Sequence, residues 1–181
     1  MTWHRVARRI RVPLGFAFTA FFLWLARPTP AFLAASLALV IPGLWLRGYA
    51  SGYVKKNAEL TVTGPYAHTR NPLYLGSMLI AFGFALAAHR IWIPIVLAAL
   101  FAAIYLPVIR SEEQYLHSVF PEFDAYAAHV PRLLPRLAPA PGTAAPASFS
   151  GTLYRKHREY NALIGAASLY AALILKWTFL K

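Results

Sequence analysis

The sequence contains no cysteine among its 181 residues. That absence excludes disulfide frameworks, thiolate metal sites and cysteine nucleophiles, but it does not identify a cellular compartment. HExxH, P-loop, GxGxxG and serine-elbow motifs are also missing. The six histidines are scattered, without the spacing of metal ligands. The sequence therefore predicts no metal site and none of these common hydrolase or nucleotide-binding classes.

Charge is scarce, and acidic residues are the scarcest. Only 13% of residues are charged, about half of the roughly 25% usual in soluble domains. The sequence has six acidic residues and 18 lysines and arginines, which give a net charge of +12. The basic residues stand at the ends of apolar runs and not along one amphipathic surface, which argues against nucleic acid as a partner. Basic flanks of this kind set membrane topology and attract anionic headgroups.

Long apolar runs, by contrast, are abundant, and 59% of residues are hydrophobic. A membrane-spanning helix needs about 20 residues; the fourth and fifth runs meet this length, and the shorter three recruit flanking residues. No cleavage site follows the first run, which we expect to be a retained helix. We predict an all-α fold, a single polytopic membrane bundle over residues 1–181 with about five transmembrane helices, near residues 12–26, 31–46, 73–88, 91–109 and 162–179.

Lysine and arginine in the loops predict the orientation of this bundle. They gather in the N-terminal segment, in the loop after the second run and in the segment after the fourth run. The positive-inside rule places these segments in the cytoplasm. We expect an integral protein of a bacterial-type inner membrane, with a cytoplasmic N-terminus and cofactor pocket. The Ala- and Pro-rich segment Leu137–Ser150 is typical of a linker, and the basic stretch Tyr154–Tyr160 follows it.

The first motif contains Gly64-Pro65-Tyr66 and Arg70-Asn71-Pro72-Leu73-Tyr74-Leu75-Gly76. Gly and Pro favour a turn, Asn71 suits a helix N-cap, and Pro72 suits the first helical turn. A helix N-terminus with Arg70 beside it favours binding of a carboxylate or another anion. The alternative is an interfacial helix start, with Arg70 on lipid phosphate and the tyrosines in an aromatic belt.

The second motif is Arg110-Ser111-Glu112-Glu113, which we expect to continue the fourth run as a helix to Phe120. Apolar residues recur there at helical spacing, with Glu112 at the centre of the stripe and Glu113 at its edge. A carboxylate in that position needs a partner, and Arg70 is the candidate. The alternative is an Arg–Glu pair that only pins two helices together. A short amphipathic helix ended by Pro131 is expected next.

Both motifs resemble the signatures of isoprenylcysteine carboxyl methyltransferase-like proteins. The first signature is carried by Leu60, Gly64-Pro65-Tyr66 and Arg70–Gly76. The second is carried by Glu112–Leu116, Phe120, Phe123, Tyr126 and Val130-Pro131. The resemblance covers about Leu60–Arg136. It implies an integral-membrane methyltransferase that takes S-adenosylmethionine from the cytoplasm and a lipidic or prenylated, lipophilic substrate from the bilayer.

The resemblance also implies roles for individual residues. The cofactor pocket would be lined by Tyr66, Arg70, Asn71, Pro72, Tyr74, Gly76, Glu112 and Glu113, and closed by Tyr126, Pro131 and Arg132. For catalysis, Arg70 or Arg132 would orient a carboxylate acceptor, whereas Glu112 or Glu113 would serve as base for an amine acceptor.

The sequence departs from the eukaryotic prenyl-cysteine enzymes at two positions. Asn71 stands where they have histidine, and Ala58 replaces a second histidine. Asn-Pro-x-Tyr-x-Gly is also similar to phospholipid N-methyltransferases, so carboxylate O-methylation and amine N-methylation both stay open, as does the oligomeric state.

Two other functions remain as alternatives. Gly-x-Tyr followed by Arg-x-Pro-x-Tyr also resembles NADPH-dependent steroid 5-alpha-reductase-like membrane oxidoreductases. A non-enzymatic membrane bundle that binds lipid through Tyr154–Tyr160 is the other.

Overall fold

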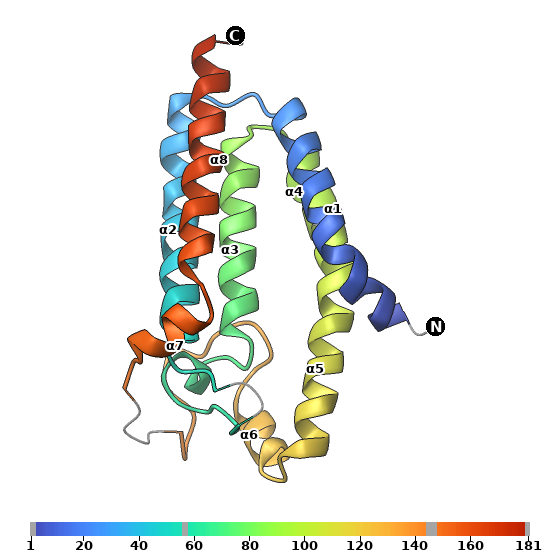
Figure 1. Cartoon of the computed structure of the whole chain (residues 1–181), viewed down its shortest axis with the longest axis vertical. Helices are drawn as coiled ribbons and strands as arrows, with labels where there is room; N and C mark the ends of the chain where they lie inside the picture. The colour runs from blue at the N-terminus through green and yellow to red at the C-terminus, as the bar shows by residue number, and fades with distance from the viewer. Residues whose placement is uncertain (1–2, 56–57, 144–147, 180–181) are drawn as a thin grey trace. The chain divides into compact units, whose positions relative to one another are not determined.

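The computed structural model describes residues 3–55, 58–143 and 148–179, with side chains from residue 13 onward. Lys56, in the basic loop after the second apolar run, lies outside the described residues. So do residues 144–147 of the expected linker. The chain is all-helical, with 72% helix and no strand over the described part. Figure 1 labels the main helices. Their bounds are α1 Trp3–Leu25, α2 Pro30–Ser51, the 3-10 turn η1 Gly64–Ala67, α3 Pro72–Ala87, α4 Trp92–Leu100, the π-helical turn η2 Phe101–Tyr105, α5 Leu106–Val119, α6 Phe123–His129, α7 Gly151–Lys156 and α8 Tyr160–Phe179.

A helix occupies each of the five expected apolar runs. Three helices are long and apolar enough to cross a membrane: Pro30–Ser51, the continuous helix Trp92–Val119 and Tyr160–Phe179. Two shorter apolar helices, Pro13–Leu25 and Pro72–Ala87, fall on the first and third expected spans. The all-helical fold is therefore confirmed for this part of the chain, with three candidate membrane-spanning helices, while the number of five spans stays a prediction.

Local signals explain where the helices begin. Pro30 and Pro72 occupy the first positions of α2 and α3, where the missing N–H costs no helical hydrogen bond. Thr29 caps α2, because its hydroxyl accepts a 3.4 Å hydrogen bond from the Phe32 N–H. The expected short helix is α6, and Val130 ends it in an extended conformation just before Pro131. The sequence did not predict α7 or the π-helical turn η2.

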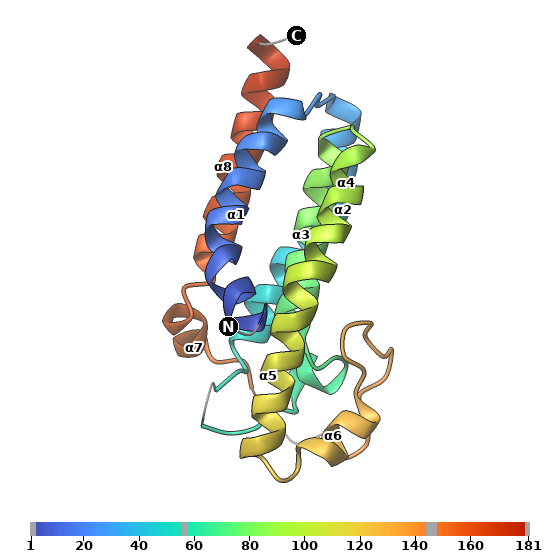
Figure 2. The ribbon, with the colours of Figure 1, turned by 90° about the vertical axis from the view of Figure 1, so that its right-hand side faces the viewer.

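The chain forms two compact units, and the first contains Met1–Val40, Ile80–Glu113 and Gly165–Lys181. Its helices pack through small and polar groups: a Cβ on Gly83 would meet the Val40 side chain and the Ser36 carbonyl, and the hydroxyls of Ser36 and Tyr170 are 2.7 Å apart. The turns after α1 and α3 lie at one end of this unit (Figure 2), joined by a 2.9 Å hydrogen bond from Arg27 N–H to Ala88 C=O.

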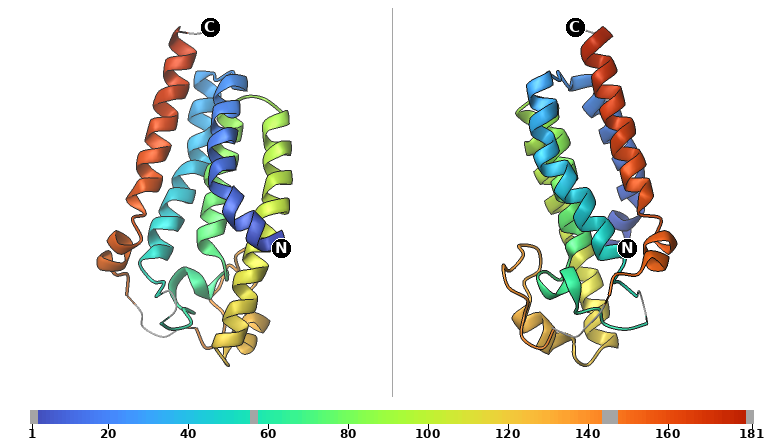
Figure 3. Two further views of the ribbon diagram at one scale, coloured as in Figure 1. Left: turned by 45° about the vertical axis from the view of Figure 1, so that its right-hand side comes forward. Right: turned by 90° about the vertical axis from the view of Figure 1, so that its left-hand side faces the viewer.

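The C-terminal end of α8 lies at this same end of the first unit (Figure 3). Lys176 Nζ donates to the backbone carbonyls of Leu23 and Trp24, at 2.5 and 2.8 Å. These are terminal carbonyls of α1, which lack helical donors and attract a cation. Helix α8 is thereby fixed to α1.

The second unit contains Ile41–Leu79 and Gln114–Ile164. One core cluster joins Phe123, Tyr126, Val130 and Ala140, with Leu116 and Phe120 packed against it. A second cluster joins Ala50, Tyr53 and Tyr66. The second unit thus has two core clusters, and Tyr66 of the first motif is buried in the second of them.

Candidate functional site

The first motif begins with η1, whose shape depends on Gly64. Gly64 has φ of +59°, a conformation that costs little only for glycine. A Cβ there would also lie 2.6 Å from the Tyr53 ring. Pro65 and Tyr66 follow and are buried. The ring of Tyr53, just after the end of α2, thus packs directly against the turn that contains Tyr66.

Thr69, Arg70 and Asn71 are tied by hydrogen bonds to the segment after α6. Arg70 N–H donates to Pro131 C=O at 2.9 Å. Thr69 Oγ1 donates to Leu133 C=O at 3.0 Å, and Asn71 Nδ2 donates to Arg132 C=O at 3.0 Å. Two segments about 60 residues apart in the sequence are therefore brought together within the second unit, as the paired signatures require.

Additional bonds extend this connection on both sides. Tyr126 Oη donates a 2.8 Å hydrogen bond to the Tyr66 carbonyl. His68 Nδ1 donates to Arg136 C=O at 2.8 Å, and the Arg136 N–H donates back to His68 C=O at 2.9 Å. His68, one of the scattered histidines, is thus engaged by a backbone carbonyl, and such a partner leaves no signal in the side-chain pattern.

Gly76 allows a close approach between α2 and α3. A Cβ on Gly76 would lie 2.6 Å from Arg47 Cγ and 2.8 Å from Gly43 C=O. The lack of a side chain at Gly76 therefore lets α2 lie close against α3. Pro72 is fully buried at the start of α3, and Tyr74 is half-buried.

The structure corrects the expected burial of the two glutamates. Glu113 is buried, with 7% of its surface exposed, and Glu112 is exposed. The prediction that Glu112 lies at the centre of the buried stripe is therefore wrong. Tyr115 and Val119, two apolar residues at the helical spacing of the predicted stripe, are also exposed, so the buried face is centred on Ile109, Glu113 and Leu116 instead.

The predicted site residues fall in both units. Tyr66, Arg70, Asn71, Pro72, Tyr74, Gly76, Tyr126, Pro131 and Arg132 belong to the second unit, and Glu112 and Glu113 belong to the first. Within the second unit the first signature is joined to the end of the second. The expected pairing of a glutamate with Arg70 stays a prediction.

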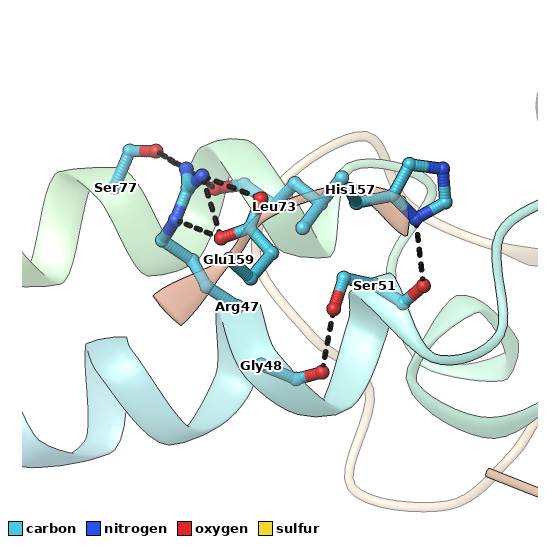
Figure 4. Close-up of polar contacts among 7 residues, drawn as sticks. All are labelled: Arg47, Gly48, Ser51, Leu73, Ser77, His157 and Glu159. Carbon is cyan, nitrogen blue, oxygen red and sulfur yellow. Dashed lines mark hydrogen bonds and ion pairs between the residues drawn. The ribbon is translucent and has the colours of Figure 1, made fainter. Parts of the chain in front are cut away.

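An ion pair outside the predicted site links three segments of the second unit (Figure 4). Arg47, on α2, donates from Nε and Nη2 to both carboxylate oxygens of Glu159, at 2.9 to 3.1 Å. Its Nη1 donates to Leu73 C=O at 3.3 Å and to Ser77 Oγ on α3. Only 24% of the Arg47 side chain and 10% of the Glu159 side chain are exposed.

Side chains of the first motif and of the segment after α6 have chemical groups of the kind that bind S-adenosylmethionine. Arg70 and Arg132 flank the joint between the two signatures and supply guanidinium groups, which match a carboxylate such as that of the amino acid part of the cofactor. Tyr74 adds a half-buried aromatic ring from the same segment, of a kind that can stack or contact a sulfonium cation, whereas the Tyr66 side chain is buried in the core cluster with Ala50 and Tyr53. No group of three metal-ligating side chains occurs in the described parts of the chain.

Residues 34–122 match the family model described as phospholipid methyltransferase. The match includes the whole first motif and both glutamates, and it confirms the predicted resemblance to phospholipid methyltransferase-like proteins. It points to a membrane methyltransferase.

Two curated proteins are similar to the chain. The cobalt-zinc-cadmium resistance protein CzcN of Cupriavidus metallidurans is 41% identical over 110 residues, which cover 61% of this chain and 50% of that protein. The nickel-cobalt-cadmium resistance protein NccN of Alcaligenes xylosoxydans xylosoxydans is 42% identical over 95 residues, 52% of this chain and 44% of that protein. The chain thus spans about half the length of these relatives. No solved structure matches it.

Proposed function

We propose that this chain, whose residues 34–122 match the phospholipid methyltransferase family, transfers a methyl group from S-adenosylmethionine to a lipidic acceptor held in the membrane. The observation that carries the proposal is the hydrogen-bonded joint between Thr69–Asn71 and Pro131–Leu133. It joins the first signature segment to the end of the second within one compact unit, with the Arg70 N–H on Pro131 C=O and the Asn71 side chain on Arg132 C=O.

The reaction assigns the protein mainly a positioning role. When bound, S-adenosylmethionine would supply a sulfonium methyl group for transfer to an acceptor oxygen or nitrogen, leaving S-adenosylhomocysteine as the other product. Holding both reactants in line is then the largest contribution available to the protein. We propose that Arg70 and Arg132 orient carboxylate groups of cofactor or acceptor, and that Asn71 and Tyr126 hold the backbone that carries them.

The glutamates suit a second task. If the acceptor is an amine, a base must remove its proton, and we propose Glu113 or Glu112 for this role. A carboxylate acceptor needs no base. In a variant that lacks both glutamates but still binds S-adenosylmethionine, amine methylation should therefore be lost and carboxylate methylation retained, which separates the two chemistries.

We further propose that this site faces the cytoplasm of a bacterial inner membrane. The segments that carry it are rich in lysine and arginine, and the positive-inside rule places such segments in the cytoplasm. The lipophilic acceptor would then arrive from the bilayer and the cofactor from the aqueous side.

Calorimetric titration of the detergent-purified protein tests the proposal. We expect binding of S-adenosylmethionine and S-adenosylhomocysteine, weakened in Arg70→Ala, and no binding of NADPH. Incubation with radiolabelled S-adenosylmethionine and a total lipid extract should then give a labelled lipid. Binding of NADPH alone would support the reductase instead, and binding of neither would support a non-enzymatic lipid-binding bundle.

A role in metal resistance is a second proposal, favoured by the similarity to the two resistance proteins. It predicts that deletion of the gene lowers the cobalt, zinc or cadmium concentration that cells tolerate. Complementation by the wild type but not by Arg70→Ala would connect resistance with the methyltransferase site. Equal complementation by both would separate them.

A further inference from the structure

Arg47 connects the proposed cofactor segment to a part of the chain that lies outside the family match. Its guanidinium donates to Leu73 C=O and Ser77 Oγ in the first turns of α3. This helix begins at Pro72, directly after Asn71. Its other donors bind Glu159, in the turn before α8. Arg47, Leu73 and Ser77 lie within the matched residues 34–122, whereas Glu159 does not.

The segment around Glu159 is itself fixed to the end of α2. Ser150 N–H donates to Gly52 C=O at 3.0 Å, and the Phe149 ring stacks on Tyr49 at 6.3 Å between centroids. His157 Nδ1 donates to Ser51 C=O at 3.0 Å (Figure 4). Glu159 is thus presented to Arg47 by a docked segment, and a nearly buried carboxylate in that place favours one orientation of the guanidinium.

We propose that Arg47 and Glu159 are a positioning pair for methyl transfer: Glu159 orients the Arg47 guanidinium, which holds the first turns of α3 and thereby sets the affinity for S-adenosylmethionine. This inference rests on the proposed function. All three nitrogens of Arg47 are engaged by protein groups, so Arg47 acts through α3 and not on a ligand. Gly76 supports the same geometry, because a Cβ there would strike Arg47 Cγ.

Three variants test the pair in the full-length protein in detergent. Glu159→Gln removes the ion pair, and Ser77→Ala removes a contact to α3 while leaving the ion pair intact. Glu59→Gln is the matched control, because Lys55 and Glu59 form an ion pair at 3.0 Å with both side chains more than half exposed. We expect about tenfold weaker S-adenosylmethionine binding in the first two variants, because a buried polar group left without its partner typically has an effect of this size, and no change in the control.

A charge exchange separates positioning from simple stabilisation. The double variant Arg47→Glu with Glu159→Arg keeps opposite charges but removes the donor to Leu73 C=O. We expect it to recover much of the thermal stability lost in Glu159→Gln without recovering cofactor affinity. Recovery of both stability and affinity would show a purely structural ion pair and overturn the proposal.

Hydrogen exchange of the backbone amides of residues 72–77 makes the outcome independent of the cofactor. Faster exchange in Glu159→Gln and Ser77→Ala, but not in Glu59→Gln, supports control of α3 by the pair. Unchanged exchange together with unchanged affinity refutes it. If the wild type binds no S-adenosylmethionine, the proposed function fails, and the exchange result alone then decides whether the pair positions α3.

Discussion

The hydroxyl of Tyr126 donates a 2.8 Å hydrogen bond to the backbone carbonyl of Tyr66, across 60 residues of sequence. Both tyrosines are buried, at 8% exposure each. The bond joins α6 to η1 inside the second unit. We therefore expect this hydroxyl to stabilise the first motif, and its removal to lower the stability of the protein.

Tyr126→Phe should destabilise the protein by about 1–3 kcal/mol, because the Tyr66 carbonyl loses a buried donor. We expect a lower midpoint of thermal unfolding in detergent and weaker S-adenosylmethionine binding. Tyr115→Phe is the control, since the Tyr115 side chain is 49% exposed. Equal midpoints for the wild type and Tyr126→Phe would contradict the structural role of this bond.

Gly76→Ala should separate α2 from α3 near Arg47. The added methyl would meet both a side chain and the backbone carbonyl of Gly43, and such overpacking costs about 1–3 kcal/mol. Gly165→Ala provides the comparison, because a Cβ at Gly165 meets nothing within 4 Å. Unfolding midpoints of the two variants, measured under the same conditions, check this expectation; a similar loss in both would exclude close packing at Gly76 as the cause.

Stability should fall at alkaline pH through Tyr53. A hydrogen bond with Tyr49 and burial raise the pKa of Tyr53 above its ordinary value of 10.0. A raised pKa in the folded state means that the contribution is fully present below the ordinary value and is lost as pH rises through the raised one. Unfolding midpoints followed upward from about pH 8 should decline less in Tyr53→Phe than in the wild type. Parallel declines would remove Tyr53 as the cause.

Tyr170→Phe should weaken the first unit modestly. The Tyr170 and Ser36 hydroxyls are 2.7 Å apart, and Ser36 is fully buried. Hydrogen bonds between membrane helices contribute on average about 0.6 kcal/mol and up to about 1.7, so the expected loss is of that size. Unfolding by a denaturing detergent measures it. Ser36→Ala should give a similar loss, and the double variant should add little to either, whereas additive losses would show that the hydroxyls do not interact.

Orientation can be tested cleanly because the chain has no cysteine. A single cysteine at Leu137, whose side chain is fully exposed, should react with a membrane-impermeant maleimide only when the cytoplasmic face is open to the reagent. A single cysteine at Ile91, which is 70% exposed, should react from the opposite face. Reaction of both from the same face would overturn the proposed topology.

Apolar runs and helix-start signals were enough to locate the five long helices. Pro30 and Pro72 act locally, so the sequence contains the reason for each boundary. By contrast, α7 was not predicted. Ser150 caps it, because the Ser150 hydroxyl accepts a 3.3 Å hydrogen bond from Leu153 N–H, but Ser150 is the last residue of the Ala- and Pro-rich segment interpreted as a linker. Burial on α5 was misjudged because exposed apolar side chains such as Tyr115 carry no information about the packed face.

The motif residues of the candidate site were predictable, but their supports were not. Asn71 and Thr69 bind backbone carbonyls of residues 132 and 133, and such partners leave no trace in residue types. Glu159 offered one usable signal. It is one of only six acidic residues and stands among arginine and lysine in the basic stretch before α8, where an acidic side chain suggests a specific cationic partner.

The π-helical turn η2 has a consequence for the two neighbouring glutamates. A π turn accommodates one more residue than an α turn, so it shifts the rotational phase of the following helix by about one residue, or 100°. Glu112 and Glu113 differ by that same angle on α5. An uninterrupted α-helix from Trp92 would carry Glu112 on the face where Glu113 is now buried. The local winding of five apolar residues, Phe101–Tyr105, therefore selects which of the two adjacent carboxylates is turned inward.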